Sequence, residues 1–343
     1  MDEFQWAKAR LGRCGAALVA IAALLACSPD SDGSASTTVS SPGGAAEADV
    51  LVVYVVDGGS GSGGMDRLLV ERPLGARPVE VGVPEVRDIG YPDVSSDGQH
   101  VVYAAFGDQA ETGQIWISSL DDEDDEPRPI TEGAEGWWCP RWMPDDRHVI
   151  AFRDVPEDQL VVLDTESGDA DVVETDIAVN EMGNCVDASP DGQDLATARN
   201  TAEVVRNEVW SIPIDGGTGR LLGTIPDDCI INHVSWSPRG TAIAADAICE
   251  RTEFNGIWLV GTSGAAPIQL AGDNPAGGPA VGSIQYWNPA WDPSGEQVFF
   301  HRNVTTRQGQ EPEPPSTWVV DTKDGRVRQA GPPATFMPAA GPA

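Results

Sequence analysis

Lysine is almost missing from this sequence, and basic residues are scarce overall. Of the 343 residues, 54 are acidic and 21 are basic, and the formal net charge is −33. Only Lys8 and Lys323 are lysines. A nucleic-acid-binding protein needs many basic side chains to displace the counterions of the phosphate backbone, so this class is excluded. The folded part is also not expected to attach to an acidic membrane surface by its charge.

The sequence also lacks the short motifs of the common enzyme classes. It contains no G-x-S-x-G, H-E-x-x-H or C-x-x-C motif, and it has only four histidines. Such motifs would mark a hydrolase nucleophile, a metalloprotease or a thiol redox site. Apolar residues make up 41% of the chain, which is enough for a packed core, so wholesale disorder is excluded as well.

Residues 1–26 are predicted to be an export signal. Lys8, Arg10 and Arg13 form a positive segment, and the apolar run Gly15–Ala26 follows. The run is shorter than the roughly 20 residues that a membrane-spanning helix needs. It ends in L-L-A-C at Cys27, which resembles the lipobox of bacterial lipoproteins. The resemblance implies cleavage before Cys27 and acylation of this residue. The alternative is an ordinary secretory signal, or a signal anchor, in which the cysteine is incidental.

Residues 27–48 are predicted to be a lipidated, disordered linker. Ser28–Ala48 consists mainly of small and polar residues with almost no large apolar side chain. Such a segment cannot bury enough surface to offset its chain entropy, so it would serve as a flexible tether. We therefore expect three parts: a signal peptide at 1–26, a linker at 27–48 and a folded domain at 49–343.

A turn motif recurs five times in the folded domain. The spacings between copies are 48, 46, 48 and 55 residues. The copies are V-S-S-D-G (Val94–Gly98), W-M-P-D-D (Trp142–Asp146), A-S-P-D-G (Ala188–Gly192), W-S-P-R-G (Trp236–Gly240) and W-D-P-S-G (Trp291–Gly295). In this motif serine caps the turn, proline presets φ and glycine takes a left-handed conformation. Short apolar runs flank every turn, so each repeat contains four expected strands.

Four-stranded units that repeat about every 45 residues are typical of β-propeller blades. Five repeats are complete, and Val50–Val56, Asp66–Glu71 and Arg77–Val81 supply three strands of a sixth. The missing inner strand is expected around Ala334–Ala339, where the C-terminal tail would close the ring. The predicted fold is all-β, a six-bladed propeller of four-stranded antiparallel blades.

The W-S-P-D-G core and the apolar strand after it resemble the propeller repeat of TolB-type periplasmic proteins, within the wider WD-like group. The resemblance covers the chain from about Ala48 to the C-terminus. It implies a TolB-like propeller outside the cytoplasm. TolB itself carries an α/β domain before its propeller, whereas only the linker precedes the repeats here. The particular partners of TolB are therefore not carried over.

We expect a membrane-anchored, non-catalytic scaffold that binds another protein of the bacterial cell envelope, without a cofactor or a metal. The propeller lyases related to this repeat bind metal through several channel histidines, and only His233 lies at such a position here. The alternative is a ligand- or metal-binding propeller with lyase or hydrolase activity on an extracytoplasmic substrate. A lipid on Cys27 would place a monomeric propeller on the periplasmic side of the outer membrane, because Ser28 is not the aspartate that favours inner-membrane retention.

The repeat also predicts which face of the propeller binds. The five turn motifs should gather on one side, the turn face, and the longer connections on the opposite side, the loop face. Long loops on a rigid scaffold often carry binding residues. The longest are Gly133–Trp138, Asp176–Asn184, Asn200–Asn207, Asp273–Tyr286 and Arg302–Ser316. The candidate binding residues are Trp137, Trp138, Tyr286 and Trp287 in the loops and Tyr91, His233 and Asn288 at the channel mouth. The alternative for the aromatic residues is that they fill gaps between blades.

Four cysteines remain after Cys14 and Cys27, and they allow three pairings. Cys229 and Cys249 flank one turn, while Cys139 and Cys185 occupy the same register in adjacent blades. Nearby thiols pair in an oxidising compartment, which favours the disulfides Cys229–Cys249 and Cys139–Cys185. The alternatives are free buried thiols, or a zinc site formed by Cys139, Cys185 and His233.

Overall fold

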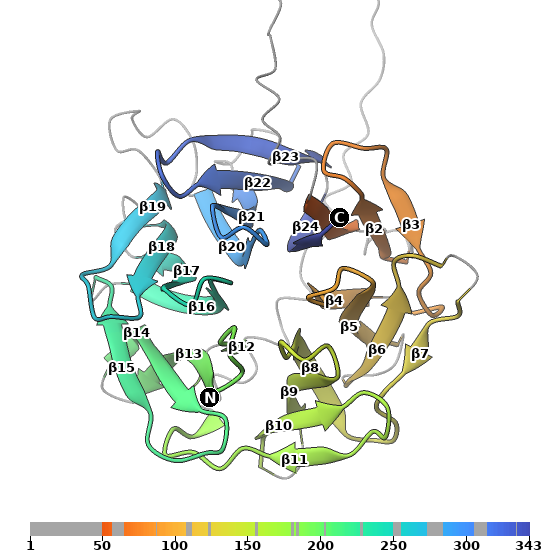
Figure 1. Ribbon diagram of the computed structural model, residues 1–343, viewed down its shortest axis with the longest axis horizontal. Coiled ribbons are helices and arrows are strands. Elements are labelled where there is room, and N and C mark those ends of the chain that lie inside the picture. Colours follow the sequence, from red (N-terminus) through yellow and green to blue (C-terminus); the bar gives the residue numbers. More distant parts are fainter. Residues whose placement is uncertain are drawn as a thin grey trace, which may run out of the picture.

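The computed structural model describes residues 50–56, 65–86, 88–107, 112–122, 125–154, 157–179, 182, 185–201, 204–226, 229–249, 255–272, 284–304, 314–333 and 335–343. The proposed signal peptide, Cys27 and the linker lie outside these residues. In the described part, 24 strands form six four-stranded antiparallel sheets. The sheets surround a central axis as the blades of a propeller (Figure 1). This arrangement confirms the predicted fold.

Each blade follows the chain from an inner to an outer strand, except that blade 1 takes its inner strand from the C-terminus. Blade 1 contains β24 (Thr335–Pro342), β1 (Val50–Val56), β2 (Arg67–Glu71) and β3 (Val79–Val81). Blade 2 contains β4 (Asp88–Val94), β5 (His100–Phe106), β6 (Gly113–Ser119) and β7 (Arg128–Pro129). Blade 3 contains β8 (Gly136–Trp142), β9 (His148–Asp154), β10 (Gln159–Asp164) and β11 (Ala170–Val172).

The other three blades have the same order. Blade 4 contains β12 (Asp187–Ala188), β13 (Asp194–Thr201), β14 (Val204–Pro213) and β15 (Arg220–Thr224). Blade 5 contains β16 (Cys229–Trp236), β17 (Ala242–Cys249), β18 (Gly256–Gly261) and β19 (Ile268–Gly272). Blade 6 contains β20 (Ile284–Trp291), β21 (Gln297–Val304), β22 (Ser316–Asp321) and β23 (Val327–Pro333). No helix among the described residues has the length and apolar character needed to cross a membrane.

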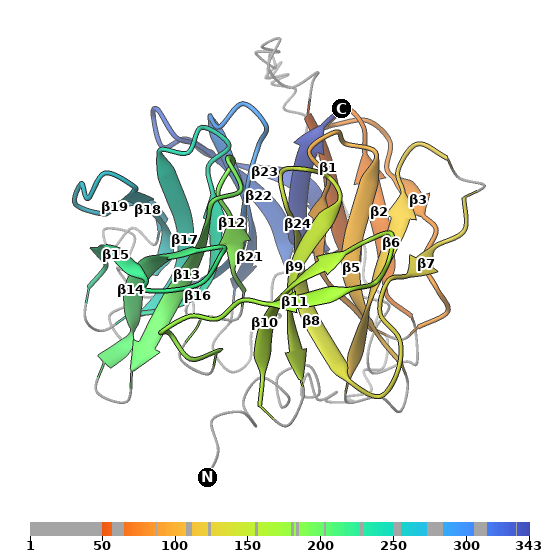
Figure 2. The same cartoon turned by 60° about the horizontal axis from the view of Figure 1, so that its bottom comes forward.

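Pairing between the two ends of the folded domain closes the ring. The strand β24 runs antiparallel to β1, with Val50 opposite Pro342 and Val53 opposite Ala339. The first described strand and the C-terminus therefore lie side by side at one end of the ring (Figure 2). Gly98, in the turn of blade 2, has a φ of +70°, and a side chain at this position would collide with the carbonyl oxygen of Pro342. The closing strand thus ends against the first turn motif.

The turn motifs gather on one face because the turns of neighbouring blades contact each other. The hydroxyl of Ser96 in blade 2 donates to Asp146 Oδ2 in blade 3 at 2.6 Å. Pro190 in blade 4 packs beside Gly240 in blade 5, and Arg239 in blade 5 donates to Glu296 in blade 6 at 3.0 Å. These contacts define the turn face, and the opposite ends of the inner strands define the loop face.

The hydrophobic core lies between the blades. One cluster joins Val102 and Ile115 of blade 2 to Val149 and Val161 of blade 3, all nearly or completely buried. The tryptophans of the turn motifs, Trp142, Trp236 and Trp291, are each 8% exposed. Because each sheet is covered on both faces by its neighbours, second strands such as β1 and β5 are continuous apolar runs rather than alternating patterns.

Candidate binding site at the loop-face end of the inner strands

A β-bulge recurs at the same position of the inner strands. The pairing with the second strand shifts register there in β4, β8, β16, β20 and β24. In four of these strands a non-glycine residue adopts a positive φ between 49° and 56°: Tyr91, Cys139, Asn288 and Met337. A proline follows each of the four. Because proline has no N–H, it loses no ladder hydrogen bond at a bulge, where the extra residue is unpaired in any case.

The bulges place one residue of each blade at an equivalent position near the loop face. The predicted members of this set were Tyr91, Cys139, Cys185, His233 and Asn288, and the structure adds Met337 of β24. The thioether of Met337 accepts the Tyr91 N–H at 3.2 Å, which joins blades 1 and 2. Sequence reasoning missed Met337 because no turn motif follows the C-terminal strand to fix its register.

Two disulfides are present, as predicted from the register. Cys139 of β8 and Cys185, two residues before β12, join blades 3 and 4, with their Cα atoms 5.6 Å apart. Cys229 and Cys249 are directly opposite each other on β16 and β17. The alternative zinc site does not form, because Cys139 and Cys185 are bonded to each other. Disulfides persist in oxidising compartments, so the protein has an extracytoplasmic location.

His233 and Asn288, from adjacent blades, are held by one buried carboxylate. Asp246, on β17, is fully buried. Its Oδ2 accepts from His233 Nδ1 at 2.6 Å and from the Asn288 N–H at 3.0 Å. Its Oδ1 accepts the N–H groups of Asn232 and His233, each at 3.0 Å. A carboxylate with four donors is well satisfied in a low-dielectric interior, so Asp246 fixes the geometry of both bulges.

Charged side chains lie two residues beyond the bulge position in three consecutive blades. They are Asp93 in blade 2, Arg141 in blade 3 and Asp187 in blade 4. Asp93 Oδ2 accepts the Trp142 N–H at 2.7 Å, and Asp187 Oδ2 accepts the Trp236 N–H at 2.6 Å. Each carboxylate thus ties its blade to the inner strand of the next one.

Burial perturbs both of these carboxylates. Desolvation raises the pKa of Asp93 to about 7, although the nearby Arg141 opposes the shift. Desolvation also raises the pKa of Asp187, again against the influence of Arg141. The hydrogen bonds and the single cation therefore do not fully compensate for the hydration that the two carboxylates lose.

The four aromatic candidates divide into two groups. Trp137 and Tyr286 are each 5% exposed and belong to the hydrophobic clusters between blades, as the gap-filling alternative expected. Trp138 and Trp287 are partly exposed. Trp138 stacks on Phe152 with ring centroids 5.4 Å apart, and Trp287 meets His233 edge-on at 6.0 Å. Trp138 and Trp287 are therefore the aromatic residues of this set that a partner can reach.

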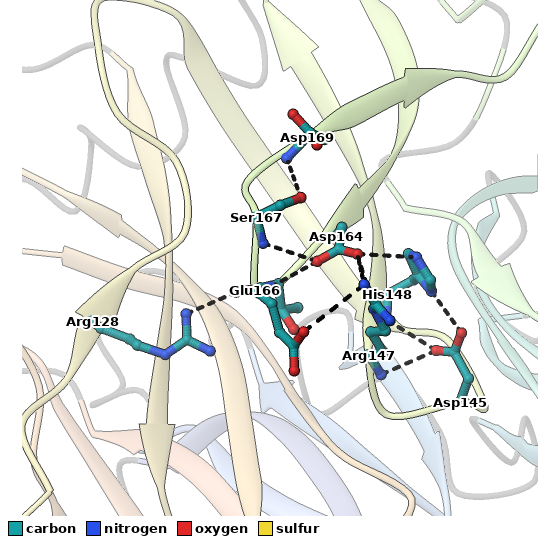
Figure 3. A network of polar contacts seen from close by, with 9 residues as sticks. Arg128, Asp145, Arg147, His148, Asp164, Glu166, Ser167 and Asp169 are labelled. Atoms are coloured by element: carbon teal, nitrogen blue, oxygen red, sulfur yellow. Dashed lines mark hydrogen bonds and ion pairs between the residues drawn. The ribbon is translucent and has the colours of Figure 1, made fainter.

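A polar network on the turn face is self-contained (Figure 3). His148 Nδ1 contacts Asp145 Oδ2 at 2.6 Å, and Arg147 Nε donates to Asp164 Oδ2 at 2.9 Å. The N–H groups of Ser167 and Glu166, together with Arg147, lower the pKa of Asp164 to about 2. These charges pair with one another within blade 3, so the network stabilises its turns rather than offering free ligands.

A groove of about 510 Å³ lies between blades 2 and 3 at the outer rim. Arg128, Trp137 and Arg153 are among its lining residues. Arg128 donates to the carbonyl oxygen of Thr165 across the blade boundary at 2.9 Å. The guanidinium of Arg153 lies 5.5 Å from the Trp137 ring centroid. Because these cations already have partners, the groove is a weaker candidate site than the inner ring.

The loop face is only partly described. Of the expected binding loops, residues 273–283 and 305–313 lie outside the described residues, as do 180–181, 183–184 and 202–203. The segment Gly133–Trp138 is described completely and leads into β8. The site that the structure defines is therefore formed by the bulges and the ends of the inner strands.

Solved structures with the same fold include TolB from Acinetobacter baumannii, with a TM-score of 0.62 and 16% identity over 84% of this chain and 66% of that chain. A protein assigned as TolB from Agrobacterium tumefaciens matches with a TM-score of 0.55 and 17% identity over 85% of this chain and 93% of that chain. Puromycin hydrolase matches with a TM-score of 0.50 and 14% identity over 82% of this chain and 52% of the hydrolase chain.

At these identities the likeness concerns the fold, and the chain is a TolB-like six-bladed propeller. It spans just under two thirds of the Acinetobacter protein. No protein-family model matches the sequence, and no curated protein is significantly similar to it.

The expectation that the chain is not an enzyme has to be corrected. An enzyme, puromycin hydrolase, shares this fold over 82% of the chain. The same propeller therefore occurs in an enzyme, and function depends on a site and not on the fold. Neither the propeller nor the missing motifs exclude catalysis.

The raised pKa of Asp93 predicts a pH-dependent stability. The Asp93 carboxyl binds a proton more tightly in the folded state than in the unfolded state, where its pKa is about 3.9. The stability that protonated Asp93 contributes to the fold is therefore lost progressively as the pH rises from about 4 towards 7. Asp93→Asn keeps an oxygen that can accept the Trp142 N–H but removes the charge. We expect the free energy of unfolding of the wild type to fall by about 4 kcal/mol relative to the variant between pH 4 and pH 8, because the pKa is raised by roughly three and each pKa unit corresponds to about 1.4 kcal/mol.

Urea unfolding at a series of pH values measures this difference. Asp169→Asn, at an exposed aspartate of the β10–β11 turn, is the matched control and should follow the wild-type profile. Parallel profiles for wild type and Asp93→Asn would show that the Asp93 carboxyl is not perturbed by burial.

Proposed function

We propose that this chain is a lipid-anchored scaffold that binds another protein of the bacterial cell envelope through its loop face. The observation that carries the proposal is the rigid ring of bulge residues on a TolB-like propeller. A disulfide, a buried carboxylate and a thioether contact fix this ring at the loop-face end. A preorganised surface of this kind loses little conformational entropy when a partner binds.

The position of the first described residue supports the choice of face. Val50 pairs with Pro342, whose carbonyl oxygen lies beside Gly98 on the turn face. A linker over residues 27–48 would therefore join the propeller at the turn face. With a lipid on Cys27, the turn face lies nearest the membrane and the loop face is directed away from it. The periplasmic side of the outer membrane remains the preferred location.

Exposed apolar side chains at the loop-face end supply contact area for a partner. Trp138 and Trp287 are partly exposed beside the bulges of blades 3 and 6. Ile230, at the start of β16, is 41% exposed. Tryptophan is enriched among the residues that dominate binding energy at interfaces. These side chains give the loop-face end exposed apolar area in blades 3, 5 and 6.

Replacing the proposed acylation site tests the anchor. Cys27→Ser should move the protein from the membrane fraction to the soluble fraction, because a serine cannot carry the thioether-linked lipid. Fractionation of cells followed by detection of the chain measures this shift. Cys14→Ser, inside the proposed signal, is the matched control and should stay with the membranes. A Cys27→Ser variant that also stays there would contradict lipid anchoring.

Site-specific photo-crosslinking in intact cells tests the binding face. A photoreactive amino acid at Ile230 on the loop face should form a discrete adduct with another protein. The same amino acid at Asp324, in the exposed β22–β23 turn of the turn face, should form none. An adduct at position 324 with none at position 230 would contradict the proposed face.

A further inference from the structure

The Asn288 side chain has an unsatisfied acceptor. Asn288 is 7% exposed, and its Oδ1 is buried with no hydrogen-bond partner among the described residues. Its backbone N–H, by contrast, is used by Asp246. Buried polar atoms are normally hydrogen-bonded, and an exception calls for an explanation. A buried carbonyl oxygen without a partner in the bulge ring is suited to a group that donates an N–H or an O–H.

His233 supplies a second acceptor next to it. The contact of Nδ1 with Asp246 Oδ2 at 2.6 Å places a proton on Nδ1. In the neutral ring, Nε2 then carries a lone pair. Among the described residues, none forms a hydrogen bond with Nε2. Because Asp246 Oδ2 lies within 3.0 Å of both His233 Nδ1 and Asn288 N, the two bulges are immediate neighbours.

The surrounding charge favours a cation. The Asp246 carboxylate behind the pair is fully buried, and with a neutral His233 ring no cation among the described residues balances its charge. Asp187, in the adjacent blade 4, is a second and partly buried carboxylate of the inner ring, with Arg141 of blade 3 near it. Trp287, edge-on to the imidazole at 6.0 Å, offers an indole against which an alkyl stem or a cation can pack.

We propose that His233 and Asn288 form a subsite for an ammonium or guanidinium group. His233 Nε2 and Asn288 Oδ1 accept the N–H donors of this group, and Asp246 supplies the opposing charge. The group belongs to a lysine or arginine side chain of the partner protein. This last identification rests on the proposed function, whereas the chemistry of the subsite does not.

Histidine NMR tests the subsite directly, because the chain has only four histidines. The full-length chain carrying Cys27→Ser is labelled with ¹⁵N-histidine, and the His233 signals are assigned with His233→Gln. Nα-acetyl-arginine amide is the probe, and Nα-acetyl-citrulline amide is its neutral isostere. We expect the Nε2 resonance of His233 to move saturably with the arginine derivative, with at least 10-fold weaker binding of the citrulline derivative.

Variants at Asn288 complete the test. Asn288→Gly permits the positive φ of 52° and removes the acceptor, so binding of the arginine derivative should weaken about 10-fold. Asn288→Asp retains an acceptor and adds charge, so binding should be at least as strong as in the wild type. Equal responses to the two probes, or an Nε2 resonance that moves with neither, would overturn the subsite. The crosslinking experiment is independent of this result, so failure of the subsite and failure of the scaffold are distinguishable.

Discussion

The inner ring depends on carboxylates that accept N–H groups from the next blade. Asp93 accepts from Trp142, Asp187 from Trp236, and Asp246 from Asn288. A charged acceptor strengthens such a hydrogen bond, but its burial is costly, as the raised pKa values of Asp93 and Asp187 show. These aspartates therefore determine how the blades are aligned rather than simply adding stability.

The links between neighbouring blades alternate between two levels of the inner strands. At the bulge level, blades 1 and 2 are joined by the contact from Tyr91 to Met337, blades 3 and 4 by the Cys139–Cys185 disulfide, and blades 5 and 6 by Asp246. Two residues further along, Asp93 joins blades 2 and 3, and Asp187 joins blades 4 and 5. The loop-face end is thus held by polar and covalent links, while the middle of each blade boundary is held by apolar packing.

Local sequence chemistry was sufficient to predict the six blades, the C-terminal closing strand and both disulfides. The turn motif has a fixed conformation and repeats in register, so it places Cys139 and Cys185 at equivalent positions. The bulges were missed, although each positive-φ residue is followed by a proline, as in Tyr91-Pro92 and Asn288-Pro289. Asp246 was missed because its partners become neighbours only when β16, β17 and β20 assemble. The burial of Trp137 and Tyr286 likewise depends on the packing between blades.

Native-state amide hydrogen exchange of Asn288, Trp142 and Trp236 tests most directly whether the carboxylates hold the ring rigid. The account predicts that these three amides exchange only through global unfolding, with the same free energy as the amides in the middle of β17. An Asn288 amide that exchanges orders of magnitude faster than the others, through local opening, would contradict a preorganised loop-face end.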